Sequence, residues 1–277
     1  MSSSAKNILL WVVAVILTMG LIIYQRATGP SYPIRGKVTI DGEVIKYKLI
    51  RTYGEESDAL VEIFTDNNDI TGSIAQKRYK SYDELSTNEM ERKEGRLVGV
   101  IPHQPPAGKV EYTITLHHNN NDYILNDEPA VIRFRGVVPW AILSPHIFFM
   151  FFSLLFGLRV GLEVFFRNVD TKYYVGIVII TLIIGGLILG PIVQKFAFGE
   201  YWTGWPFGHD LTDNKTLFTF IFWVIAWFVL RKNPQNKTWP IIAVFAMLLV
   251  YLIPHSVLGS EIDHTKEAKE NTEIINE

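Results

Sequence analysis

The sequence predicts a mixed fold: a polytopic α-helical membrane protein of five transmembrane helices, with an inserted antiparallel β-sandwich domain on the outer face. Three observations lead to this prediction. Apolar residues make up 48% of the 277 residues, and only 19% are charged. The apolar residues gather in five blocks, of the length that a bilayer-crossing helix requires. The polar stretch between the first two blocks, residues 26–136, alternates apolar and polar residues as strands do.

The five apolar blocks follow one another in the order 8–24, 137–166, 173–192, 216–230 and 239–258. The first block follows Lys6, but no small-residue cleavage site comes after it, so residues 1–25 are predicted to be an uncleaved anchor. The fourth block is the shortest, and its helix is expected to begin near Asp213 or Asn214, either of which is a good N-cap. Residues 137–258 are then a four-helix transmembrane bundle, and 259–277 an acidic C-terminal tail.

The placement of basic residues predicts the orientation. If the N-terminus is cytoplasmic, the short inner segments hold Lys6, Arg159, Arg167, Lys172, Arg231, Lys232 and Lys237. The short outer loop holds only Lys195 and Lys215, and a long outer domain does not enter the comparison. We therefore expect a bacterial inner-membrane protein with a cytoplasmic N-terminus. Its β-domain and C-terminus would be periplasmic.

Candidate strands recur along the polar domain, at 37–40, 44–50, 59–64, 70–78, 95–101, 110–117, 123–125 and 131–134. Asp41-Gly42 lies between the first two and predicts a type I′ hairpin turn. So many short strands in one domain are typical of a β-sandwich. Residues 80–93 are polar and are expected to form a short helix or an excursion between strands.

The segment Pro-Pro-Ala-Gly-Lys-Val-Glu-Tyr at 105–112 resembles the strand entry of immunoglobulin-like and fibronectin-type domains. The resemblance covers the outer domain only. It implies an immunoglobulin-like fold for that domain, and a shared fold implies no particular function.

Composition excludes several classes of function. The net charge of −2 and the pI near 6.4 do not suit nucleic-acid binding, which usually needs a basic patch. The chain has no cysteine, so disulfides, thiolate metal sites and thiol nucleophiles are excluded. No phosphate-binding loop, Gly-x-Ser-x-Gly or His-Glu-x-x-His motif is present, which favours a protein that is not an enzyme.

The outer loop 195–215 is the most unusual stretch, because it combines many aromatic residues with glycines and acidic side chains. Large aromatic side chains cost free energy in water, so we expect this loop to be ordered and partly buried. It is interpreted either as a structural plug or as a ligand site. The candidate ligand-binding residues are Trp202, Trp205, His209, Asp210 and Asp213.

Three histidines fall at the outer ends of the predicted helices: His146, His209 and His255. Neutral imidazole is a common metal and haem ligand, so these three are the candidate metal or haem ligands. Hydrogen bonds to carbonyls or headgroups are the simpler interpretation. No cofactor is predicted.

The charges and glycines within the predicted helices are interpreted as structural features rather than as parts of a transport pathway. Arg159 and Glu163 lie four residues apart, so they can pair, and are expected to snorkel to the cytoplasmic interface. No charge lies mid-membrane in the other helices, which argues against an ion pump. Gly186 and Gly190 form a GxxxG match that suits either packing within the chain or dimerisation.

Together these features predict an interaction or assembly subunit of a membrane complex, acting through its outer domain and aromatic loop. The expected partners are the lipid bilayer and a membrane protein or a second copy of the chain, with no nucleic acid. Two alternatives remain open. One is a haem- or metal-binding redox subunit, and the other is a binder of a small molecule or lipid.

Overall fold

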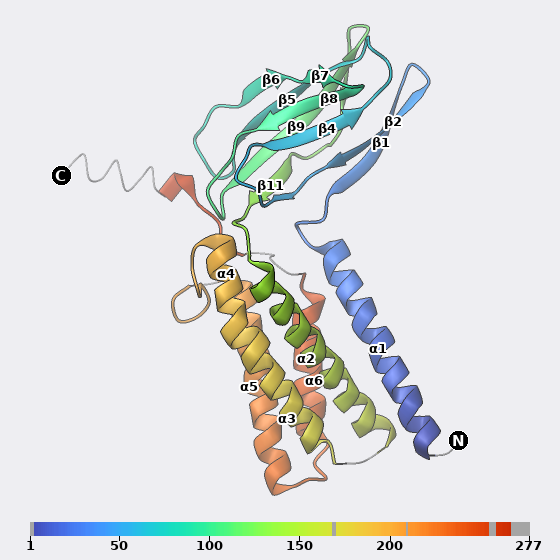
Figure 1. The fold of residues 1–277 in the computed structure, drawn as a ribbon, viewed down its shortest axis with the longest axis vertical. Helices are drawn as coiled ribbons and strands as arrows, with labels where there is room; N and C mark the ends of the chain where they lie inside the picture. The colour runs from blue at the N-terminus through green and yellow to red at the C-terminus, as the bar shows by residue number, and fades with distance from the viewer. Residues whose placement is uncertain (1–2, 168–169, 209, 255–258, 267–277) are drawn as a thin grey trace, which may run out of the picture. The chain divides into compact units, whose positions relative to one another are not determined.

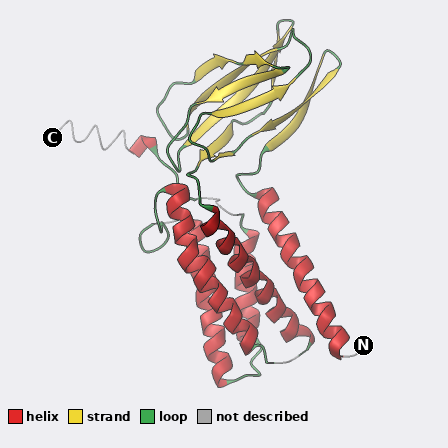
Figure 2. Cartoon of the chain, viewed as in Figure 1, coloured by secondary structure: helices red, strands yellow, loops and turns green. Residues whose placement is uncertain are grey.

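The computed structural model describes residues 3–167, 170–208, 210–254 and 259–266. The chain divides into two compact units. One is a bundle of helices formed by residues 1–30 and 138–259, which we call the helix bundle. The other, residues 31–137 and 260–277, contains the strands and is called the β-domain. Figures 1 and 2 show that all strands lie between helices α1 and α2 in the chain.

The helix bundle contains α1 (Ser3–Thr28), α2 (Trp140–Phe166), α3 (Lys172–Thr181), the π-helix η1 (Leu182–Leu189), α4 (Gly190–Phe198), α5 (Leu211–Lys232) and α6 (Thr238–Leu252). The segments α3, η1 and α4 form one continuous helix. Four described helices are long and apolar enough to cross a membrane: α1, α2, Lys172–Phe198 and α5. They are consistent with an integral membrane protein. The fifth predicted crossing, α6, is an apolar helix of only 15 residues.

Apolar side chains from α2, α3, α5 and α6 form the core of the helix bundle, with Trp223 and Met247 fully buried in it. Glycine allows the closest approach, because a Cβ on Gly157 would lie 2.6 Å from Met247. Helix α1 packs against α2 and α6. Near its C-terminal end, Gln25 Nε2 donates to the carbonyl of Tyr251 at 2.7 Å. Because Tyr251 lies near the C-terminal end of α6, the two helices run parallel.

The β-domain contains β1 (Ile34–Ile40), β2 (Glu43–Leu49), β3 (Thr52–Tyr53), β4 (Ala59–Phe64), β5 (Thr71–Arg78), β6 (Ser86–Glu89), β7 (Glu91–Lys93), β8 (Arg96–Ile101), β9 (Lys109–His118), β10 (Asn121–Ile124) and β11 (Ala130–Phe134). The described strands form a β1-β2 hairpin, a sheet of order β3-β11-β9-β5-β6 with β10 on β9, and a sheet of order β4-β8-β7. Pairing is antiparallel except between β11 and β3.

Alternation along the strands builds one core from all three sheets. In β9 every second residue is buried, from Val110 through Ile114 to His118, as the sequence pattern predicts. The hairpin prediction is also confirmed, since Asp41 and Gly42 both have positive φ and join β1 to β2. Of the two alternatives for residues 80–93, the short helix is wrong. The segment leaves β5 and includes the edge strands β6 and β7 before β8, and their polar side chains gave no alternating apolar signal.

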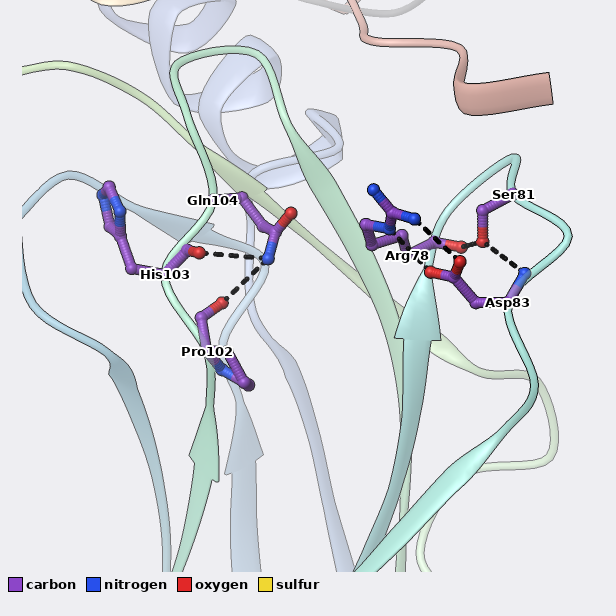
Figure 3. Close-up of polar contacts among 6 residues, drawn as sticks. All are labelled: Arg78, Ser81, Asp83, Pro102, His103 and Gln104. Carbon is purple, nitrogen blue, oxygen red and sulfur yellow. Dashed lines mark hydrogen bonds and ion pairs between the residues drawn. The ribbon is translucent and has the colours of Figure 1, made fainter. Parts of the chain in front are cut away.

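Two polar turns complete the connections of this domain (Figure 3). After β5, the Arg78 guanidinium binds the Asp83 carboxylate through two hydrogen bonds of 2.6 and 2.8 Å. This charged hydrogen bond lowers the pKa of Asp83 to about 2. After β8, the Gln104 amide donates to the carbonyls of Pro102 and His103. Both turns satisfy their backbone groups with their own side chains.

The first residues of the predicted acidic tail are a structured part of the β-domain. Glu261 accepts hydrogen bonds from Lys80 and Lys109, and Arg133 donates to the carbonyl of Ser260. The backbone N–H of Thr265 donates to the carbonyl of Lys80 at 3.1 Å. Residues 260–266, which we call the C-terminal strap, are therefore fixed by one carboxylate and by backbone hydrogen bonds. Residues 267–277 lie outside the described part of the chain.

Candidate functional site

The aromatic loop is the connection from α4 to α5, residues 199–210. Helix α4 ends at Phe198 and is capped by Gly199, which adopts the left-handed conformation that favours glycine. Helix α5 begins at Leu211 with Asp210 as its N-cap, whose carboxylate accepts from the N–H of Thr212 at 2.7 Å. The cap was expected at Asp213 or Asn214. The helix starts one turn earlier, so those two residues lie in its first turn and face back to the loop.

Asp213 and Asn214 hold the loop by its backbone. One carboxylate oxygen of Asp213 accepts from the N–H groups of Thr203 at 2.8 Å and Gly204 at 3.0 Å. The side-chain oxygen of Asn214 accepts from the N–H of Trp205 at 2.7 Å. Gly204 must be glycine here, because a Cβ would lie 2.6 Å from the Cβ of Asp213. Three consecutive N–H groups are thus bound by two neighbouring helical side chains.

The tip of the loop is braced further, yet its aromatic side chains are exposed. Trp202 Nε1 donates to the carbonyl of Trp205 at 3.1 Å. The exposed fractions are 57% for Tyr201, 68% for Trp205 and 83% for Phe207. The helix bundle therefore does not cover the rings at the tip, and the expected partial burial of the loop stays a prediction. The loop is ordered by polar contacts, so it does not need to bury its rings to hold its shape.

Three of the candidate ligand-binding residues have hydrogen-bond partners in the loop or in the first turn of α5: Trp202, Asp210 and Asp213. Trp205 is free to contact another molecule through its ring, and His209 lies outside the described residues. A ligand role for them stays a prediction.

Of the three candidate metal ligands, the structure places only His146. Its Nδ1–H donates to the carbonyl of Gly185 in η1 at 2.9 Å. This is the simpler of the two interpretations, a histidine bound to a backbone carbonyl. His209 and His255 lie outside the described residues, and no metal-binding group of three or more side chains occurs among the described ones. The haem or metal alternative therefore stays a prediction.

The glycines of the GxxxG region serve contacts within the chain. A Cβ on Gly185 would lie 2.8 Å from Phe149 of α2, and one on Gly186 would lie 2.6 Å from Thr216 of α5. Both neighbouring helices therefore pack directly on the backbone of η1. Of the two interpretations of this motif, packing within the chain is the one that these contacts support.

A charged cluster lies at the opposite end of the bundle and consists of Asn7, Arg159, Glu163 and Arg167. Arg159 and Glu163 form an ion pair and are 0% exposed, so the expectation that they snorkel to the interface is wrong. The Asn7 side-chain oxygen accepts from Arg159 at 2.5 Å and from Arg167 at 3.1 Å. The ring of Trp11 lies 5.0 Å from the Arg159 guanidinium. Helix α1 supplies part of the surroundings of these charges, while Arg159 Nε and Nη1 and Glu163 Oε2 are buried without a hydrogen-bond partner among the described residues.

Sequence reasoning missed a hydrogen-bonded line of three side chains in the β-domain. Ser73 Oγ lies 2.9 Å from His117 Nε2, and His117 Nδ1 lies 2.7 Å from Asp122 Oδ1. These residues come from three neighbouring strands, β5, β9 and β10. They are too far apart in the chain for any sequence motif to indicate them. The register Thr71↔His117 and His117↔Asp122 brings them to one face of the sheet.

The atom pattern matches a serine–histidine–carboxylate triad, but the surroundings differ. A serine hydrolase needs an accessible Oγ and N–H donors directed at the oxyanion. Ser73 is 7% exposed, and its strand is paired on both sides, with β6 and with β9. The line is therefore a fixed polar ladder that orients His117 and Asp122. Comparisons of the chain with protein-family models, curated proteins and solved structures give no match.

Proposed function

We propose that this chain is an integral membrane protein with five crossings, a cytoplasmic N-terminus, and its β-domain and C-terminus on the outer, periplasmic side of a bacterial inner membrane. The parallel arrangement of α1 and α6 supports five crossings. Three long apolar helices lie between them in the chain, so α6 must cross in the same direction as α1. Its 15 residues span about 22 Å. Beyond the C-terminal end of α6, Lys215 of α5 binds the carbonyls of Ile253 and Pro254.

The C-terminal strap also supports an even number of membrane crossings after residue 137. Because residues 260–266 bind the β-domain, the chain must return to the side of that domain after α6. Four crossings after residue 137 satisfy this condition and three do not. A reporter that is active only outside the cytoplasm, fused after Glu277, should therefore be active. Activity of a fusion at Pro234 instead would overturn the orientation.

An immunoglobulin-like sandwich is the fold that we propose for the β-domain. Two observations support it: the sheets β3-β11-β9-β5-β6 and β4-β8-β7 share one hydrophobic core, and β2 packs beside β4. Two sheets with a common core are the architecture of a sandwich.

The biochemical role we propose is that of a non-enzymatic interaction or assembly subunit, which contacts a membrane-protein partner through the aromatic loop. One observation carries this proposal: the loop tip is rigidly braced, yet it exposes Tyr201, Trp205 and Phe207. Aromatic side chains, tryptophan above all, dominate the binding energy of protein interfaces. A loop that is already ordered loses little conformational entropy on binding, which favours affinity.

Photo-crosslinking in intact cells tests the proposal. A benzophenone amino acid is placed at Trp205 or Phe207, and as a control at Tyr173, an exposed aromatic residue at the start of α3. We expect one defined protein adduct from the loop positions and none from Tyr173. The adduct should weaken when Asp213→Ala releases the backbone of the loop. Adducts with lipid alone at all three positions would instead mean that the tip is a membrane-interface anchor, and the assembly role would be wrong.

A further inference from the structure

A second surface, in the β-domain, has the features of a binding site. A concavity of about 390 Å³ opens at one end of the strands and is lined by Asp69, Thr71, His117, His118, Asn119, Asn120 and Asp122. It is formed by the β4–β5 connection and the β9–β10 turn. This is the end of β9 that lies opposite Lys109, which pairs with Arg133 near the exit of the chain toward α2. Every lining residue is polar.

Two residues of this lining, His117 and Asp122, are held in place by hydrogen bonds. The ladder from Ser73 through His117 to Asp122 fixes the ring of His117 and the carboxylate of Asp122, both of which line the concavity. Ser73 itself is buried and does not line it. A binding group that is fixed before the ligand arrives loses less conformational entropy on binding. Ser73 is accordingly a positioning residue.

His118 also lines the concavity, but its ring nitrogens are directed at the protein. Its ring is 7% exposed, and its Nε2 accepts from the side-chain amide of Asn119 at 3.0 Å and lies 3.7 Å from the Asp41 carboxylate. Its Nδ1 is enclosed by the protein. His118 therefore contributes to the shape of the concavity and supplies no donor to a ligand.

The chemistry of the lining selects the class of ligand. The carboxylates of Asp69 and Asp122 repel anions, and the predominantly polar lining offers little to an apolar molecule. No group of three metal-ligating side chains occurs among the described residues. A polyhydroxylated neutral molecule fits, because its hydroxyls donate to the carboxylates and accept from the side-chain amide N–H groups of the β9–β10 turn. We propose that this concavity binds a neutral saccharide.

The test uses the full-length protein in lipid nanodiscs, because glycosidic detergents would compete for the site. Neutral disaccharides of glucose, galactose, mannose and N-acetylglucosamine are screened by saturation-transfer NMR, and the strongest is titrated by calorimetry. We expect saturable binding of at least one sugar. Asp122→Ala should weaken it about tenfold or more, because it removes a charged acceptor and releases His117.

The control is Asp127→Ala, which removes an exposed carboxylate from the same domain but outside the concavity. It should leave sugar binding unchanged. Ser73→Ala should weaken binding several-fold while Ser73→Thr, which keeps the hydroxyl, restores it. If Asp122→Ala fails to fold, the conservative Asp69→Asn provides the same test at the other carboxylate.

Two results would overturn the proposal. The first is the absence of saturation transfer to any of the sugars, or transfer that Asp122→Ala, Ser73→Ala and Asp69→Asn all leave unchanged. The second is saturable binding of Ca²⁺, titrated alone, that disappears in Asp122→Ala, since the concavity would then be a cation site. Neither result bears on the aromatic loop, which belongs to the other unit of the chain.

Discussion

The two ends of the helix bundle differ in which side chains they bury. At one end the charged cluster buries Arg159 and Glu163 completely. At the other end the aromatic loop leaves Trp205 and Phe207 exposed. Hydropathy alone predicts the reverse at each end. Contacts with particular partners thus matter more than hydropathy. A charge can be buried beside an opposite charge and an amide, even though Arg159 Nε and Nη1 and Glu163 Oε2 have no hydrogen-bond partner in the part of the chain that the structure describes. An aromatic ring can stay outside the bundle where hydrogen bonds already order its backbone.

The largest expected effect comes from removing one partner of the buried ion pair. Glu163→Ala leaves the Arg159 guanidinium buried without a counter-charge, which should cost about 3–5 kcal/mol of unfolding free energy. The measurement is equilibrium unfolding of the purified protein in mixed detergent micelles. Replacing both residues by apolar ones, Arg159→Met with Glu163→Leu, should recover most of the loss. A cost below about 1 kcal/mol for Glu163→Ala would show that water reaches this pair.

A smaller and more local effect is expected at the other end of the bundle. Asp213→Ala removes the acceptor of two backbone N–H groups, so the loop should lose about 1–3 kcal/mol of local stability. Hydrogen exchange in nanodiscs should show faster exchange at Thr203 and Gly204. Asn214→Ala, which frees only the N–H of Trp205, provides a graded comparison and should have the weaker effect. Equal and slow exchange in both variants would mean that the rings, not the carboxylate, order the loop.

The C-terminal strap shows how charge pairing behaves where water competes. Burial opposes ionisation of Glu261, but the hydrogen bonds and charges of Lys109 and Lys80 outweigh it, so its pKa lies below the ordinary value of 4.5. A carboxyl group with a lowered folded-state pKa stabilises the fold above its unfolded pKa, and this contribution disappears as pH falls through the folded value.

Acidification below about pH 4.5 should therefore loosen the strap progressively. Exchange of the amides of Ile262 and Thr265 reports on it directly. Glu261→Gln should show the loosened behaviour already at pH 7, at a cost of about 1 kcal/mol, and Glu128→Gln in an exposed turn is the matched control. A strap that stays protected at low pH in the unsubstituted protein would mean that its backbone contacts suffice.

The smallest effect on stability is expected at the exposed rings. Trp205→Ala combined with Phe207→Ala should change the unfolding free energy in detergent by no more than about 0.5 kcal/mol, because neither ring packs in the protein core. The same unfolding assay as for Glu163→Ala measures it. A loss of several kcal/mol would place these rings in the folding core and remove the contrast between the two ends.

The sequence predicted those parts of the fold that depend on local pattern. Helices α1, α2 and α5 and strands such as β4 and β9 follow from runs of apolar residues or from alternation. The polar edge strands β6 and β7 had no such signal. The candidate sites depended on contacts between distant residues, so they were less accessible to sequence reasoning. Asn7 stabilises Arg159 across 152 positions, and His117 bonds Ser73 across 44.

The interior π-helix η1 has a consequence for how this chain tolerates insertions and deletions. A π segment inside an α-helix is equivalent to one extra residue in the helical repeat. Deleting a single residue within 182–189 should therefore return the segment to regular α-helix with little rotation of α4 relative to α3, because the π segment already absorbs the extra residue. A deletion elsewhere in this helix, which no π segment absorbs, would rotate everything that follows by about 100°. Loss of one residue within η1 should thus preserve the direction in which the helix presents the aromatic loop.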